Sequence, residues 1–120
     1  MMTGKEYLRS LAGVKSDKKK TDKVASIYTA DLPEIILKIV SNAKEPIFLD
    51  DDSRVLSYDE IVDAEKDLHV AFKEKRMIPL VDCGENDFIV YHFEDRIWSK
   101  FNIIDETVFM KKNSLEELLK

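Results

Sequence analysis

The sequence contains one cysteine, three glycines, three prolines and two histidines among its 120 residues. A single cysteine, Cys83, excludes an internal disulfide and any metal site that needs several thiolates. With glycine only at Gly4, Gly13 and Gly84, the chain has no glycine-rich loop of the kind that binds phosphates. It also has no HExxH motif, no Cys/His cluster and no EF-hand loop. The sequence therefore predicts no metal site and no cofactor.

Long apolar runs are absent as well. None approaches the roughly 18 apolar residues that a membrane-spanning helix needs. The N-terminus, MMTGKEYLRSLAGV, lacks an apolar stretch followed by a small-residue cleavage site, so we expect no signal peptide. Together with the single cysteine, these absences predict a cytoplasmic protein with no membrane partner.

The net charge of −5 is unevenly distributed along the chain. Residues 1–30 contain seven Lys or Arg and three Asp or Glu, a charge of +4, so residues 31–120 carry −9. An acidic body repels nucleic acid and attracts basic proteins. We therefore expect a basic protein partner and no nucleic acid. The alternative is that the acidity serves solubility alone.

Apolar residues at helical spacing predict helices over residues 3–14, 31–44, 57–76 and 113–120. The last three begin with Asp or Ser followed three positions later by Glu, the pattern of a capping box, in the pairs Asp31/Glu34, Ser57/Glu60 and Ser114/Glu117. The segment KSDKKKTDK, residues 15–23, has no apolar residue and indicates a solvated linker or a frayed helix end. We accordingly divide the chain into an N-terminal helix with a basic linker, residues 1–30, and a domain over residues 31–120.

Strands are predicted in two places. PIFLDDDSRVLS, residues 46–57, indicates a short hairpin with Asp50, Asp51 and Asp52 in its turn. A cation site there is disfavoured, because successive side chains on an extended chain point in opposite directions. The runs MIPLVD, FIVYHF and RIWSKFNI indicate a three-stranded antiparallel meander, whereas DETVFMKK has no clear preference. This order predicts an α+β fold, a single domain whose antiparallel sheet with a central meander packs against helices.

The segment VDCGEND joins the first two strands of the meander and carries three acids, Asp82, Glu85 and Asp87. Gly84 and Asn86 tolerate the positive φ that tight hairpins require, and aspartates bond the N–H groups of turns. These residues favour a turn over a metal site. Acidic neighbours raise the pKa of a thiol, which argues against a nucleophilic cysteine here.

The two histidines give no catalytic pattern. Alternation along FIVYHF makes both faces of this strand apolar, so we expect His92 to be a half-buried packing residue. His69 is expected on the solvent side of its helix. No Ser or Cys nucleophile stands at a recognisable spacing from His92. The sequence therefore predicts a protein that is not an enzyme.

Trp98 has two open interpretations. Alternation along RIWSKFNI places it between Arg96 and Lys100 on one face, where it would be an exposed interface residue. The other interpretation is a tryptophan packed across the meander against Val90 or His92, or under the N-terminal helix.

Three stretches together resemble the SUKH superfamily: RVLSYDEIVDAEKDL, MIPLVDCGENDFIVYHF and IWSKFNIIDETVFMKKNSLEELL. The similarity covers residues 31–120 and consists of Leu-Ser before the central helix, an IPL-D strand, an acidic turn, an apolar strand and a closing SL-ELL helix. The superfamily includes the yeast Smi/Knr-type cell-wall regulator and many bacterial immunity proteins. This sequence departs from it in having SNAK where many members have Asn-Gly or Gly-Gly, and in keeping only Gly84 at the acidic turn.

The resemblance implies a non-catalytic immunity protein that neutralises a cognate polymorphic toxin by binding it, and the acidic body fits a basic toxin such as a nuclease. The alternative is a regulatory or scaffold module that binds another cellular protein. The residues predicted to contact the partner are the acids of the two turns and two apolar anchors: Asp50, Asp51, Asp52, Asp82, Glu85, Asp87, Tyr91 and Trp98.

Overall fold

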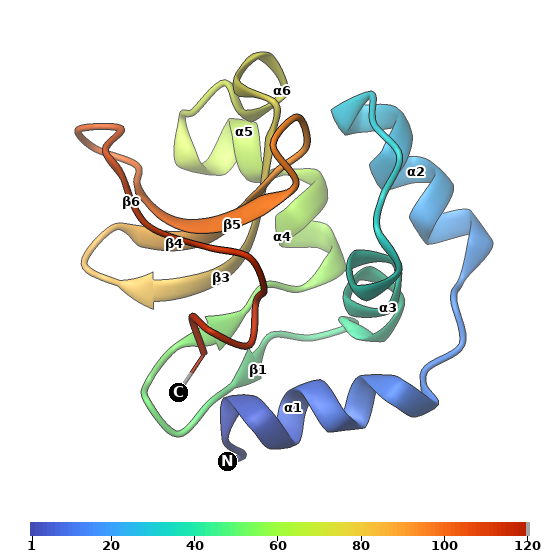
Figure 1. Ribbon diagram of the computed structural model, residues 1–120. Coiled ribbons are helices and arrows are strands. Elements are labelled where there is room, and N and C mark those ends of the chain that lie inside the picture. Colours follow the sequence, from blue (N-terminus) through green and yellow to red (C-terminus); the bar gives the residue numbers. More distant parts are fainter. Residues whose placement is uncertain (120) are drawn as a thin grey trace.

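Six strands form one antiparallel sheet in which each strand pairs with its neighbours in the sequence (Figure 1). The computed structural model describes residues 1–119. The strands are β1 (Ile47–Phe48), β2 (Arg54–Val55), β3 (Met77–Gly84), β4 (Asp87–His92), β5 (Ile97–Asn102) and β6 (Val108–Lys112). The predicted meander is β3–β5, and the predicted hairpin is β1–β2. The segment without a clear preference supplies β6, which makes β5 an inner strand.

Helices precede the sheet and also lie between β2 and β3. They are α1 (Gly4–Ser10) with the 3₁₀ turn η1 (Leu11–Gly13), α2 (Lys18–Tyr28), α3 (Glu34–Asn42), α4 (Tyr58–Val62), α5 (Ala64–Leu68) and α6 (Phe72–Lys75). The predicted α+β fold, with helices packed on an antiparallel sheet, is confirmed. Among residues 1–119, no helix combines the length and the apolar character that crossing a membrane requires.

The sheet is covered on both faces at its centre. Phe72 of α6 packs edge-on against Phe101, with ring centroids 6.1 Å apart. On the other face, Leu118 and Leu119 of the C-terminal segment lie next to Ile89. All residues from Phe88 to Tyr91 are accordingly buried, as the unbroken apolar run predicted.

Residues 1–30 share this core. Tyr7 and Leu11 at one end and Val24 and Tyr28 at the other are buried, and Met2 pairs with Leu49 in a parallel bridge. The predicted linker over residues 15–23 is wrong from Lys18 onward, because α2 begins there with Asp17 as its cap. Thr21, Val24 and Tyr28 follow at helical spacing and are all buried, so packing of this face fixes the helix.

The prediction of one continuous helix over residues 57–76 is wrong. Its start is confirmed, since Ser57 and Glu60 form the capping box, but the chain continues as three short helices. His69 has a left-handed backbone with φ 57°, ends α5 and is exposed, so it does not lie on the side of a continuous helix. Nine residues of straight helix turn through about 900°, so Val70 would lie opposite Ile61. Breaking the helix at His69 allows both side chains to be buried.

The structure also corrects two other helix predictions, the cap at Asp31 and the helix over residues 113–120. Asp31 does not cap α3, whose N-cap is Pro33, with no side-chain hydrogen bond. The predicted helix over 113–120 is a single turn, in which the Leu119 N–H donates to the Leu115 carbonyl at 3.2 Å. Glu117 accepts from the Ser114 N–H as predicted, and the three leucines of this turn, Leu115, Leu118 and Leu119, are buried. Residue 120 of that prediction lies outside the described residues.

Candidate functional site

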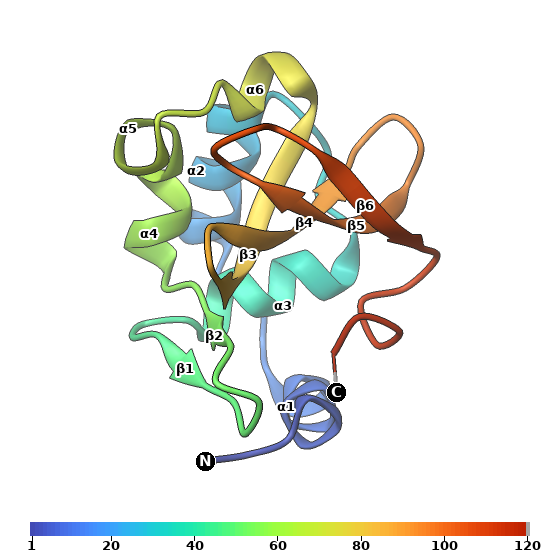
Figure 2. The same cartoon turned by 90° about the vertical axis from the view of Figure 1, so that its left-hand side faces the viewer.

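Three turns meet at one end of the sheet, and we call this surface the turn edge: residues 49–53 (β1–β2), 84–87 (β3–β4) and 103–107 (β5–β6), with the adjoining Phe48 and Val108. Antiparallel neighbours place alternate turns at the same end. The pairs Arg54/Asp82 and Asp87/Asn102 fix this alignment. Figure 1 shows the three turns along its left-hand side, and Figure 2 views the molecule from that side.

The turn edge is acidic. Its exposed acids are Asp50, Asp51, Asp52, Glu85, Asp105 and Glu106, and Asp87 is half-buried beside them. Two cations from elsewhere reach this edge: Lys75 pairs with Glu106, and the charge of Lys100 acts on Asp51. The structure therefore brings together five of the six predicted acids, which come from segments more than thirty residues apart, and adds two from the third turn.

The geometry of the turns explains why acidic residues occur at several of these positions. Gly84 and Asn86 have positive φ, as predicted, and so do Asp52 and Glu85. Asp51 accepts a hydrogen bond from the Ser53 N–H at 3.0 Å. Burial alone would raise the pKa of Asp51, but the bonds from Ser53 outweigh it and the pKa is lowered. In residues 1–119, no group of three or more His, Cys, Asp or Glu side chains is arranged to hold a metal ion.

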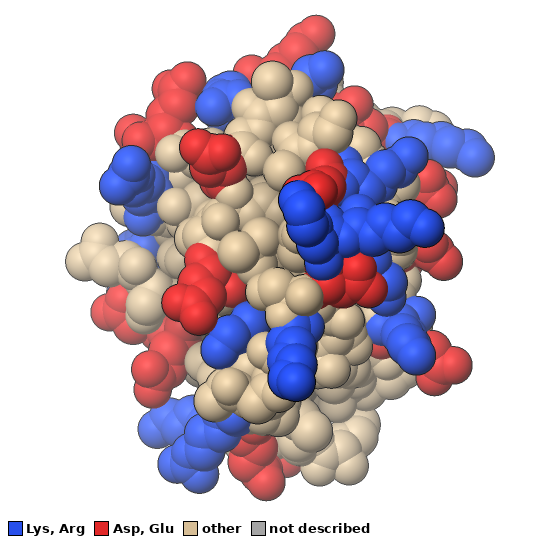
Figure 3. Space-filling model, turned by 90° about the vertical axis from the view of Figure 1, so that its right-hand side faces the viewer, with Lys and Arg blue, Asp and Glu red and all other residues tan. Residues whose placement is uncertain are grey.

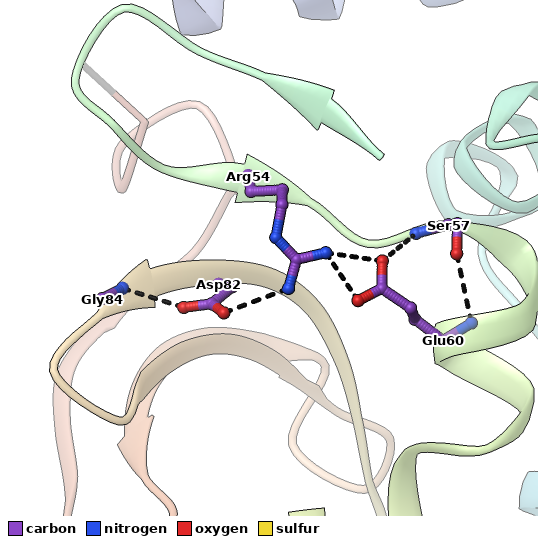
Figure 4. A network of polar contacts seen from close by, with 5 residues as sticks. All are labelled: Arg54, Ser57, Glu60, Asp82 and Gly84. Atoms are coloured by element: carbon purple, nitrogen blue, oxygen red, sulfur yellow. Dashed lines mark hydrogen bonds and ion pairs between the residues drawn. The ribbon is translucent and has the colours of Figure 1, made fainter. Parts of the chain in front are cut away.

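The carboxylates of Asp82 and Asp87 accept hydrogen bonds from other residues of the fold. Asp87 accepts from the Asn102 amide at 2.9 Å, which ties β4 to β5 beside the turn. Asp82 accepts from the Gly84 N–H at 2.9 Å and from Arg54 Nη2 at 3.2 Å (Figure 4). The Asp82 side chain is 28% exposed and pairs with Arg54, so it is used within the fold, and its contact with a partner stays a prediction.

Arg54 holds two carboxylates from different elements (Figure 4). Its Nη1 donates to Glu60 Oε1 at 2.6 Å, while Nη2 donates to Asp82. Glu60 also accepts from the Ser57 N–H at 3.1 Å, so the capping box of α4 and the β2–β3 pair share one arginine. Burial would raise the pKa of Glu60, but the Arg54 hydrogen bond and charge outweigh it and the pKa is lowered. This network stabilises the base of the turn edge.

The two predicted apolar anchors are buried. Tyr91 and Trp98 are 8% and 4% exposed and stand opposite each other on β4 and β5, with ring centroids 5.0 Å apart. The prediction that Trp98 is an exposed interface residue is wrong. The alternative, a tryptophan packed across the meander, is confirmed in its general form, but the residue opposite Trp98 is Tyr91 and not Val90 or His92. The β4–β5 register places Trp98 directly opposite Tyr91 on the same face of the sheet, so the two rings cover each other.

Other apolar side chains are exposed at the turn edge: Phe48 (56%), Ile104 (73%) and Val108 (36%). Large exposed apolar groups beside charged ones are typical of protein interfaces. The sequence carried one signal for Phe48, since alternation along IFL places it on the face opposite Ile47 and the buried Leu49. Val108 had none, because its segment DETVFMKK had no clear strand preference, and Ile104 lies between that segment and the predicted strand RIWSKFNI.

His92 has a partner that its sequence spacing did not predict. Its Nε2 lies 2.7 Å from Ser99 Oγ, across the β4–β5 pair. Ser99 is fully buried, so this oxygen cannot reach a substrate. His92 itself is half-buried, as expected, and burial lowers its pKa. The contact joins two strands and gives no accessible nucleophile.

The basic residues of the N-terminal segment gather on α2. Figure 3 views the molecule from the side of this helix and shows Lys and Arg close together, with acids among them. Lys18 pairs with Asp22 at 3.0 Å, and Lys20 lies over the ring of Tyr58. Our expectation that the protein does not bind nucleic acid stays a prediction.

Comparison of this chain with protein-family models, with curated proteins and with solved structures finds no match.

Proposed function

We propose that this protein binds a basic protein through the turn edge, and that it serves as an immunity protein of the SUKH type by neutralising a toxin. The observation that carries the proposal is the combination of exposed acids with Phe48 and Ile104 on one edge of the sheet. Interfaces of this composition combine long-range attraction with apolar contact. The proposed action is stoichiometric and requires no catalytic residue.

Electrostatics and apolar contact have separate roles in the proposal. Asp50, Asp52 and Glu85 are exposed on turns, where their charges act on an approaching cation before contact. They should raise the association rate, and salt should weaken this effect because the Debye length is only about 8 Å at physiological ionic strength. Phe48 and Ile104 should slow dissociation, since a few buried apolar anchors carry most of the binding energy.

The acidity favours one class of toxin. An enzyme that acts on nucleic acid must present cations to phosphates. A row of carboxylates on an immunity protein can occupy those cations and cover the substrate face. The proposed partner is therefore a basic toxin, with a nuclease as the best-fitting kind.

The test is co-expression with the product of the adjacent gene, followed by a pull-down and a growth assay. A triple variant, Asp50→Lys, Asp52→Lys and Glu85→Lys, should lower the association rate by at least tenfold and abolish rescue. The matched control, Glu45→Lys, Asp63→Lys and Glu116→Lys, changes the total charge equally at exposed positions outside the turn edge. It should retain most of the binding.

Three outcomes would contradict parts of the proposal. Equal losses in the two triple variants would mean that net charge matters and the turn edge does not. A neighbouring product that is no toxin, or that does not bind, would remove the immunity function. Binding of a cellular protein without any rescue from toxicity would instead favour the regulatory or scaffold module.

A further inference from the structure

A pocket of about 410 Å³ lies at the other end of the sheet from the turn edge. It is formed where the β4–β5 turn meets the connection between α2 and α3, which Figure 1 shows side by side. Its apolar wall consists of Leu32, Pro33, Tyr91 and Phe93. Small-molecule sites usually enclose about 300–1,000 Å³, so the pocket is large enough for a compact ligand.

Two arginines line this pocket, and one of them is held in place. Arg76 donates to the Thr29 carbonyl at 3.1 Å, lies 5.8 Å from the Phe93 ring centroid and has Glu94 at 3.8 Å from its Nε. Arg96 is exposed and forms no ion pair with residues 1–119. Planar guanidinium groups bind carboxylate and phosphate through paired hydrogen bonds.

Further donors lie in the same wall. Tyr91 is 92% buried and lines the pocket, so its hydroxyl is a further group that can donate to a bound oxyanion. Pro33, also in the wall, is the N-cap of the nine-residue helix α3 and provides no side-chain cap. The first N–H groups of a helix lack partners within it, and its dipole favours an anion at that end. Asp31 is the one carboxylate among the lining residues.

We propose that this pocket binds a small ligand that contains both an aromatic ring and a phosphate or carboxylate group. The oxyanion would be bonded by Arg96 and Arg76, with the Tyr91 hydroxyl as an additional donor. The ring would lie against Phe93 and Pro33, because flat apolar and aromatic surfaces favour stacking. The site is separate from the turn edge, so it does not depend on the proposed toxin binding.

Titration of the full chain, followed by amide NMR and calorimetry, tests this proposal with two probes. AMP carries a phosphate and indole-3-acetate carries a carboxylate, and the two distinguish the sources of the oxyanion. Adenosine and inorganic phosphate are the two halves of AMP, and indole and acetate are the two halves of indole-3-acetate. At least one complete probe should shift the amides of residues 30–32 and 91–96 and should bind more tightly than either of its halves.

Substitutions then test the assigned groups. Arg96→Gln should weaken binding about 10- to 100-fold, since hydrogen bonds to charged groups are strong, and Tyr91→Phe should weaken it several-fold. Asp31→Asn should strengthen binding by removing the like charge. The matched control, Arg9→Gln, removes an exposed arginine from α1 and should change nothing.

The proposal would be overturned if neither probe shifted these amides at millimolar concentration, or if Arg96→Gln bound as tightly as the wild type. Weaker binding by Asp31→Asn would assign a cation to the pocket and would also overturn it. Adenosine binding as tightly as AMP, together with indole binding as tightly as indole-3-acetate, would show that the oxyanion has no role.

Discussion

Two tyrosines in the first 28 residues offer a direct test of how the N-terminal helices are held. Tyr7 of α1 and Tyr28 of α2 are 0% and 1% exposed, so both rings belong to the core. The Tyr28 hydroxyl donates to the Ile61 carbonyl at 2.7 Å, beside the break between α4 and α5. The Tyr7 hydroxyl is buried without any partner among residues 1–119. Replacing each by phenylalanine removes one oxygen and keeps the ring.

Only one of the two substitutions should lower the free energy of unfolding. Tyr28→Phe removes a hydrogen bond and leaves a buried carbonyl without its donor, which costs about 1–2 kcal/mol. Tyr7→Phe removes a buried hydroxyl that has no bond to lose, so stability should stay the same or rise by about 1 kcal/mol. The entropy of unfolding for 120 residues gives roughly 4 °C for each kcal/mol. The expected shifts in Tm are about −4 to −8 °C and about 0 to +4 °C.

Urea denaturation and thermal melting of the two variants beside the wild type measure these shifts. Equal m-values across the three proteins would establish that the midpoints report the native state. If Tyr7→Phe proved as destabilising as Tyr28→Phe, the Tyr7 hydroxyl would have a hydrogen-bond partner. Our account of α1 packing would then be refuted.

Alkaline unfolding provides an independent measure of the same two groups. Burial raises the pKa of both hydroxyls above the ordinary value of 10.0. A group whose pKa is higher in the folded state contributes stability below its unfolded pKa and loses it as pH rises. Stability should therefore fall above pH 10, and less steeply in each Phe variant.

Three other predictions concern the site and its surroundings. Arg54→Met should lower stability by about 1–3 kcal/mol at pH 7. Because the pKa of Glu60 is lowered from its ordinary value of 4.5, the difference from wild type should shrink as pH falls below that value, and an unchanged difference in acid melts would refute the Arg54 network. In urea titrations Trp98→Ala should cost about 3–5 kcal/mol, whereas Phe48→Ala should stay within about 0.5 kcal/mol, and similar losses would contradict their different burial. Burial raises the pKa of Cys83 to about 11 from 9.0, so its labelling by a thiol reagent at pH 8 should be roughly a hundredfold slower than that of a free thiol. Labelling at the free rate would mean that the thiol lies open to solvent.

Sequence patterns that span only a few residues predicted the local structure correctly. The capping box at Ser57 and Glu60, the positive φ at Gly84 and Asn86, and the buried strand at residues 88–91 all appear as expected. Each depends on the chemistry of adjacent positions, so the fold class and most strands followed from them. The length of the helix predicted over residues 57–76 did not follow from such a pattern. The chain breaks at His69, and this break allows Val70 to be buried.

The sequence by itself determined an α+β chain with acids concentrated in turns, because alternation, caps and turn residues are local properties. Only the tertiary structure decided which of those acids face solvent together. The strand order aligned three turns at one end, took Asp82 into the Arg54 network, and buried Tyr91 and Trp98 between strands. It also placed Phe48 and Ile104 on the surface beside the remaining acids. Exposure depends on what packs over a residue, and the covering segments here are distant in sequence, so no local pattern contains that information.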